Sequence, residues 1–168
     1  MKKLLSILAL FLIGASWAGA KVTLPSFISD NMVLQQNSQA AIWGWTDAGK
    51  KVTVTTTWTG VKYTATPDEN GKWLVMLDTP GAGGPYKIFV ADGEERIALQ
   101  NVLVGEVWFC SGQSNMEMPV KGFGSQPVEG SSEIIMGAKA KTPIRMCTIK
   151  RKASLSPIEE AEGSWEEN

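Results

Sequence analysis

The stretch VGEVWFCSGQSNMEM, residues 104–118, decides how the chain is organised. It opens with a short apolar run, rich in β-forming residues, that stops abruptly at Ser111-Gly112. A short apolar run between such breakers is typical of a buried strand of a parallel sheet, and we expect one at residues 107–110. The turn that follows is expected to present Ser114 beyond the carboxyl end of that strand, where ligands bind in open α/β sheets.

A serine in such a turn has two interpretations. Most serines in glycine-containing turns only bond to the nearby backbone. A catalytic serine needs a base that takes its proton and amide groups that receive the oxyanion. The chain lacks the Gly-x-Ser-x-Gly elbow of ordinary α/β-hydrolases, because Met116 stands in the place of the second glycine.

The longer string at residues 105–116 resembles the nucleophile block of the sialate O-acetylesterase family, a branch of the SGNH-type serine esterases. The resemblance implies that Ser114 is the nucleophile and that its backbone N–H contributes to the oxyanion hole. It also implies that the parent enzyme hydrolyses an acetyl ester on an O-acetylated sugar. By resemblance the sugar is a sialic acid, although related secreted esterases act on acetylated plant polysaccharides of the acetyl xylan type. We expect Gln113 and Asn115, in the same turn, to orient the serine loop or to contact the acetyl group.

The chain contains no histidine, the residue whose pKa best suits a base near neutral pH. In the family that residues 105–116 resemble, the base is a histidine in an Asp-x-x-His segment far downstream. We therefore expect an amino-terminal fragment of a longer esterase, inert by itself. The alternative is a non-catalytic secreted β-sandwich module that binds a glycan or a partner. An Asp-x-x-His segment encoded beyond Asn168 would favour the esterase, and a stop codon there would favour the module.

Residues 1–20 have the features of a secretory signal peptide. Lys2 and Lys3 precede an apolar run that is too short to span a bilayer comfortably, and small residues lead up to Ala20. Cleavage near Ala20 leaves about 150 residues, the size of one ordinary domain or of one small domain and part of another. We expect a secreted or periplasmic chain with no membrane contact after cleavage; an uncleaved anchor is the alternative.

Charge and cysteine content argue against several partners and cofactors. A formal net charge of −1 at pH 7 gives no electrostatic reason for binding nucleic acid or an anionic membrane. Cys110 and Cys147 are too few for a disulfide scaffold and lack the spacing of metal ligands. They can pair in an oxidising compartment, but the sequence does not require it. Without histidine a zinc site of the usual kind is not expected, and we predict no metal and no cofactor.

Residues 21–103 are predicted to form a β-sandwich domain. Short β-forming runs recur between turn signals at the spacing of a small sandwich, so we expect seven or eight antiparallel strands. The runs are 32–35, 41–45, 51–58, 61–66, 73–77, 86–91 and 96–99. Four tryptophans in this region are interpreted as core residues, with stacking on a sugar as the alternative. They are Trp43, Trp45, Trp58 and Trp73.

Residues 104–168 are predicted to be the incomplete start of an SGNH-hydrolase-like α/β domain. The expected elements after the serine turn are a loop at 122–130, a helix at 133–141 and a strand at 144–149. A strand, a helix and a strand in succession favour the opening of a parallel sheet. Ser131 or Ser132 is the candidate N-cap of the helix. The tail at residues 154–168 shows no clear element and is expected to be frayed.

Two carboxylates, Glu106 and Glu117, flank the serine in the sequence. A catalytic pair of carboxylates needs a defined separation across a substrate, which neighbours in sequence do not establish. We therefore predict structural roles for both.

Overall fold

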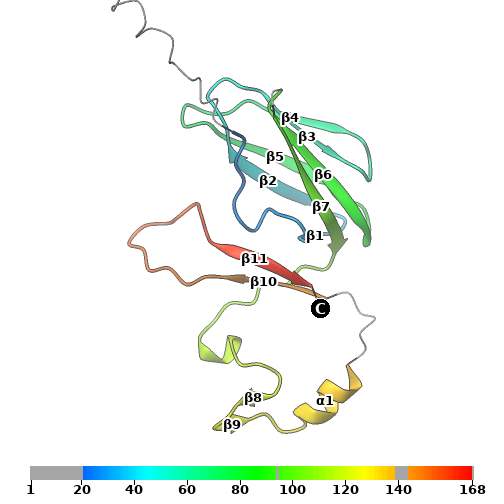
Figure 1. Cartoon of the computed structure of the whole chain (residues 1–168), viewed down its shortest axis with the longest axis vertical. Helices are drawn as coiled ribbons and strands as arrows, with labels where there is room; N and C mark the ends of the chain where they lie inside the picture. The colour runs from blue at the N-terminus through cyan, green and yellow to red at the C-terminus, as the bar shows by residue number, and fades with distance from the viewer. Residues whose placement is uncertain (1–20, 94, 139–143, 168) are drawn as a thin grey trace, which may run out of the picture.

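The computed structural model describes residues 21–93, 95–138 and 144–167, and this part of the chain is mostly β (Figure 1). The predicted signal peptide, residues 1–20, lies outside the described residues. Residues 21–105 carry seven strands, and we call this region the β-unit. Its strands are β1 (Val33–Gln35), β2 (Gln39–Trp45), β3 (Val52–Thr56), β4 (Lys62–Ala65), β5 (Lys72–Asp78), β6 (Gly83–Ala91) and β7 (Arg96–Gly105).

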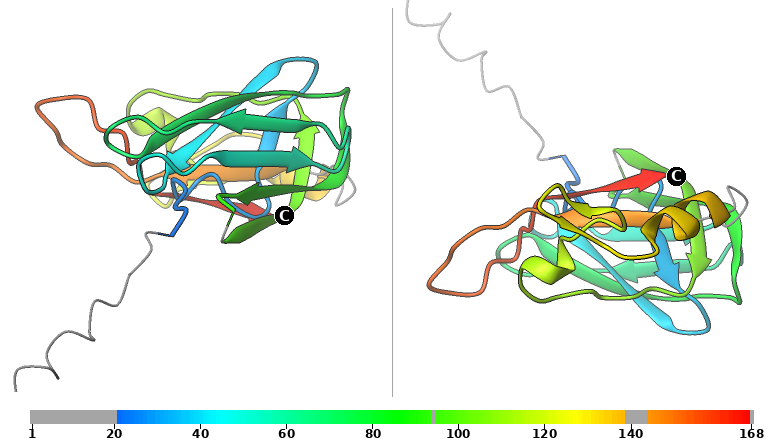
Figure 2. Two further views of the ribbon diagram at one scale, coloured as in Figure 1. Left: turned by 90° about the horizontal axis from the view of Figure 1, so that it is seen from above. Right: turned by 90° about the horizontal axis from the view of Figure 1, so that it is seen from below.

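The β-unit contains a five-stranded mixed sheet in the order β1-β7-β6-β3-β4 and a two-stranded sheet of β2 and β5. Seen from above, these strands curl around a common interior (Figure 2, left). All but one of the pairings are antiparallel, as expected. The exception is β1, which pairs parallel to β7 with Val33 opposite Leu103. Antiparallel pairing is natural for strands joined by a hairpin, whereas β1 and β7 are separated by the other five strands.

Side chains from both sheets build one core. On β3, Val52, Val54 and Thr56 are buried while the residues between them are only partly covered, which is the period-two pattern of a strand with one buried face. Ile88 on β6 and Leu77 on β5 are completely buried in the same core. Each such side chain contributes about 1.5–3 kcal/mol of apolar burial. The β-unit therefore has a packed interior of its own.

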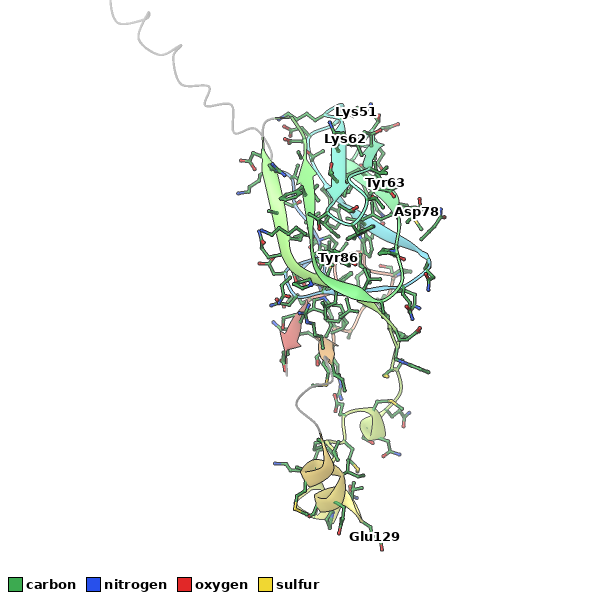
Figure 3. All side chains as sticks on the ribbon, turned by 90° about the vertical axis from the view of Figure 1, so that its right-hand side faces the viewer. Lys51, Lys62, Tyr63, Asp78, Tyr86 and Glu129 are labelled. Atoms are coloured by element: carbon green, nitrogen blue, oxygen red, sulfur yellow. The ribbon has the colours of Figure 1, made fainter. Side chains whose placement is uncertain are left out.

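The core role of the tryptophans is confirmed for Trp73, which is 2% exposed. Trp43 and Trp58 are half-buried and pack against the core. Trp58 lies just beyond the end of β3, and its Nε1 donates to the carbonyl oxygen of Asp78 at 2.9 Å. The Asp78 backbone N–H also donates to the Tyr63 hydroxyl at 3.3 Å, which ties β4 to the end of β5; Figure 3 shows Tyr63 and Asp78 close together.

The rest of the described chain forms short elements and one hairpin. The short elements are a 3₁₀ turn η1 (Ser114–Met116), β8 (Gly122–Phe123), β9 (Gln126–Pro127) and α1 (Ser131–Gly137). The hairpin consists of β10 (Arg145–Ile149) and β11 (Gly163–Glu167). It lies between the β-unit and the segment that carries η1 and α1 (Figure 1). In the described part of the chain, no helix has the length and apolar character needed to cross a membrane.

The predicted strand at residues 107–110 does not form. Trp108 and Phe109 are 84% and 90% exposed, and no strand lies alongside them within the described ranges. A strand needs a neighbour to accept and donate its backbone hydrogen bonds, so an apolar run without one stays outside any sheet.

The predicted opening of a parallel sheet does not form among the described residues. The strand expected at 144–149 forms as β10, but its partner is the antiparallel β11. Residues 163–167 of the tail are not frayed, because they pair with β10 and Trp165 packs against the core of the β-unit, whereas residues 154–162 form no helix or strand.

The predicted helix is present but shifted. It begins at Ser131 rather than residue 133, and its N-cap is Gly130 with φ 73° rather than either candidate serine. Glycine adopts this left-handed conformation without the steric cost that other residues meet. The carboxyl end of the predicted helix, residues 139–141, lies outside the described ranges.

Candidate functional site

The serine turn is a single tight bend. Gln113 is extended, with φ −103° and ψ −152°, and the chain then turns through η1 at Ser114. The Met116 N–H donates to the Gln113 carbonyl oxygen at 2.9 Å, and the Glu117 N–H donates to the Ser114 carbonyl oxygen at 3.1 Å. The turn therefore uses carbonyl groups at its start and leaves the Ser114 N–H, the first of the turn, without a partner in the described chain.

Gln113, Ser114 and Asn115 are all exposed, as the position of the motif in a turn predicts. Their side chains make no hydrogen bond to any described residue, so no base is placed against the Ser114 hydroxyl there. A serine hydroxyl without a base is a weak nucleophile. What this part of the chain supplies is a displayed hydroxyl, a free backbone N–H and two free side-chain amides.

Two small cavities lie away from the serine turn. They have volumes of about 150 and 190 Å³ and open at the end of the β10–β11 hairpin, and Lys150 and Glu162 line both. These two side chains form an ion pair at 2.8 Å. The hydrogen bond between them raises the pKa of Lys150 and lowers that of Glu162. Ser114 lines neither of these two cavities.

Glu106 is held by two glutamines of the β-unit. Gln36 Nε2 donates to Oε1 of Glu106 at 2.5 Å, and Gln35 Nε2 donates to Oε2 at 3.2 Å. These hydrogen bonds, that of Gln36 first, lower the pKa of Glu106 below its usual value. Gln35 also accepts a hydrogen bond from the Val107 N–H at 2.9 Å. The carboxylate thus fastens the chain where it leaves β7, in keeping with the structural role predicted for it.

Glu117, on the other side of the serine, forms an ion pair with Arg151, the second residue after β10. Both side chains are more than half exposed, and exposed ion pairs contribute little to stability. The pair nevertheless connects the serine turn to the hairpin. Neither Glu106 nor Glu117 is hydrogen-bonded to the Ser114 hydroxyl.

Sequence reasoning missed the residues that anchor this region. Arg145 donates to the carbonyl oxygens of Asn31, at 3.0 Å, and Asn101, and to Asn101 Oδ1 at 3.0 Å. Both asparagines have positive φ, 66° and 53°. Asparagine is enriched in that conformation, but nothing in the sequence links these positions to an arginine more than 40 residues away.

The cysteines are not paired. Cys110 is an exposed free thiol and Cys147 a half-buried one. Partial burial raises the pKa of the Cys147 thiol. Within the described residues, no three His, Cys, Asp or Glu side chains are grouped so as to hold a metal ion.

Comparison with known proteins places this chain beside carbohydrate esterases. No family model matches it. Human sialate O-acetylesterase is 37% identical over 123 residues, which cover 68% of this chain and 24% of the human protein. The sialate O-acetylesterase of Mus musculus is 34% identical over 160 residues, covering 88% of this chain and 29% of the mouse protein.

A solved structure shows the same similarity. The crystal structure of a carbohydrate acetylesterase from Xanthomonas citri matches with a TM-score of 0.74 and 28% sequence identity. The match covers 88% of this chain and 32% of that protein. The chain thus spans between a fifth and a third of the length of the relatives it matches.

Proposed function

Because this chain belongs to the sialate O-acetylesterase-type family, we propose that it is the nucleophile-bearing part of a secreted carbohydrate acetylesterase. The observation that carries the proposal is Ser114, displayed with a free hydroxyl at the start of a tight exposed turn. Its oxygen attacks the acetyl carbon of an ester on a sugar. A base takes the serine proton and passes it to the sugar oxygen as the ester C–O bond breaks. Water then hydrolyses the acetyl-serine, which releases acetate and restores the serine.

The turn offers groups for the developing negative charge. The Ser114 N–H has no partner in the described chain, and an N–H at the start of a turn is oriented to receive an oxyanion. The side-chain amides of Gln113 and Asn115 are equally unoccupied and lie on either side of the serine. We assign them supporting roles, as donors to the acetyl group or to the serine loop.

The proton acceptor is proposed to be a histidine outside residues 1–168. The chain has no histidine, and the relatives it matches are three to five times longer. The 168 residues alone are therefore proposed to be inert, as a fragment of the enzyme.

The same proposal accounts for the exposed apolar run beside the serine. Trp108 and Phe109 leave almost all of their surface open to water, which is unfavourable for aromatic side chains. We propose that residues 107–110 become a strand of a parallel, SGNH-like sheet when further chain pairs with them. In this arrangement residues 104–168 begin the catalytic domain, and residues 21–103 are a β-sandwich that braces it. Residues 1–20 direct export and are removed near Ala20.

Paired serine variants test the proposal. In the enzyme extended by the downstream reading frame, Ser114→Ala abolishes hydrolysis of p-nitrophenyl acetate and leaves the thermal unfolding temperature nearly unchanged. Ser111→Ala, an equally exposed serine of the same stretch, is the matched control and keeps most of the activity. A folded Ser114→Ala enzyme with most of its activity intact would remove this residue from the mechanism. The 168-residue chain is expected to show no turnover above its own Ser114→Ala variant.

A further inference from the structure

The serine turn is fastened to the β-unit on its amino-terminal side. Gln35, at the end of β1, uses both ends of its amide: Nε2 donates to Glu106 and Oε1 accepts the Val107 N–H. Gln36 does the same, donating to Glu106 and accepting the Ala82 N–H at 2.8 Å. Two adjacent residues of the β-unit thus hold the chain seven and eight residues before Ser114.

The turn also has a contact on its carboxyl-terminal side. Three residues after the serine, Glu117 pairs with Arg151, just beyond β10. That strand is in turn held by Arg145, which reaches the carbonyl oxygens of Asn31 and Asn101. Asn31 lies two residues before the start of β1. Both connections therefore end on one small region of the β-unit, at the two ends of β1 and the adjoining part of β7.

The Arg145 contact is a built site and not a chance surface pair. A guanidinium is a planar fork of donors, and it is filled here by two backbone carbonyls and one amide oxygen. The left-handed backbone conformation of Asn31 and Asn101 orients their carbonyl groups toward the guanidinium group. The two asparagine side chains are hydrogen-bonded to each other: Nδ2 of Asn101 donates to Oδ1 of Asn31 at 2.9 Å.

The second strand of the hairpin adds further contacts to the same unit. Trp165 Nε1 donates to the Phe27 carbonyl oxygen at 2.8 Å, and the Gly163 N–H donates to Ser26 Oγ at 2.8 Å. Both strands of the hairpin are thus hydrogen-bonded to the β-unit, so a contact with the hairpin connects indirectly to the β-unit.

We propose that the β-unit sets the position of Ser114, and that Gln35 and Arg145 are the positioning residues through which it acts. Neither touches the serine: Gln35 acts through Glu106 and Val107, and Arg145 acts through the hairpin. The consequence for catalysis rests on the proposed function, whereas the positional statement does not. Catalysis depends on sub-ångström placement of the nucleophile, so loosening either attachment lowers turnover even in a folded enzyme.

A distance measurement between spin labels tests the proposal without any ester. Cys110, four residues before Ser114, carries one nitroxide, and Lys62→Cys on the exposed β4 carries the other in a Cys147→Ser background (Figure 3). Pulsed electron–electron resonance on the chain then gives the distance distribution from the β-unit to the serine segment. We expect one narrow peak in the parent protein.

Gln35→Ala and Arg145→Met are each expected to broaden and shift that peak. Arg145→Lys is expected to do the same, because an ammonium group lacks the guanidinium fork. The matched control is Arg96→Met, which removes an arginine stacked on Phe89 elsewhere in the β-unit and leaves the peak unchanged.

A second pair keeps the test decisive if the methionine variant fails to fold. Asn101→Gly retains the left-handed backbone and its carbonyl but loses the Oδ1 acceptor, and broadens the peak. Asn37→Gly, at another left-handed asparagine with φ 48°, does not. A peak that stays narrow in folded Gln35→Ala and Arg145→Lys proteins, or one already broad in the parent, overturns the positioning role. Neither result bears on whether Ser114 is the nucleophile, which the serine variants decide separately.

Discussion

At the scale of single residues, the Glu106 carboxylate makes the stability of the chain depend on pH. Its pKa lies below the ordinary value of 4.5 in the folded protein, because the amides of Gln36 and Gln35 donate to the ionised form. A group with a lowered folded pKa stabilises the protein above its unfolded pKa, and this contribution is lost as the pH falls through the folded pKa.

Glu106→Gln is therefore expected to lower the free energy of unfolding at pH 7 and to have no effect once the pH is below the folded pKa of Glu106. Urea unfolding of the two proteins across this range measures the difference. Glu129→Gln, at an exposed carboxylate far from the β-unit (Figure 3), is the control. Its free energy of unfolding is expected to depend on pH in the same way as that of the parent protein. An equal loss from Glu106→Gln at every pH would mean that the ionised carboxylate is not what the glutamines stabilise.

Sequence reasoning identified Ser114 as a candidate, but it did not identify Gln35 and Arg145, the residues proposed to position it. Ser114 became a candidate because residues 105–116 resemble a known nucleophile block, and the Ser111-Gly112 break predicted the turn that the structure has there. No sequence pattern pointed to Gln35 or Arg145. The partner of Gln35 is about 70 residues away in the sequence, and the partners of Arg145 are 44 or more residues away. Contacts of this kind depend on how strands associate, and a local pattern does not contain that information.

At the scale of elements, the turn between β4 and β5 requires glycine at position 71. Gly71 has φ 77°, and a Cβ there would overlap the carbonyl oxygen of Thr46. Gly49 has a similar φ of 85°, but the space around it is open.

Gly71→Ala is expected to lower the free energy of unfolding by about 2–4 kcal/mol, the left-handed strain of about 1–2 kcal/mol plus a backbone clash of similar size. Gly49→Ala is expected to cost only the strain, about 1–2 kcal/mol. Chemical denaturation of both variants measures the two values. Equal losses would show that the contact with Thr46 relaxes without cost.

Strand patterns predicted the β-unit well and the residues after it poorly. The seven runs of the β-unit all became strands because each has neighbours that complete its hydrogen bonds. Residues 107–110 have the same kind of pattern but no neighbour, and they remain exposed. The opposite error occurred in the tail, where the polar stretch around Trp165 gave no strand signal yet pairs with β10. Partner availability, and not local propensity, decided both cases.

At the scale of the whole molecule, the β-unit and the hairpin form a packed framework. The serine segment is attached to this framework at Glu106, Val107 and Glu117, but its own residues are exposed. The helix α1 has no buried residue, and Met136 is 78% exposed. This distribution agrees with a chain whose relatives are several times longer.

The most direct test of the account is to find the acetyl group during turnover. The enzyme extended by the downstream reading frame is mixed with an acetylated sugar, quenched rapidly in acid and digested for peptide mass spectrometry. We predict one added acetyl group on the peptide that contains Ser114, absent in the Ser114→Ala protein. An acetyl group on another residue, or active turnover with no acetylated peptide at any time, would contradict the account.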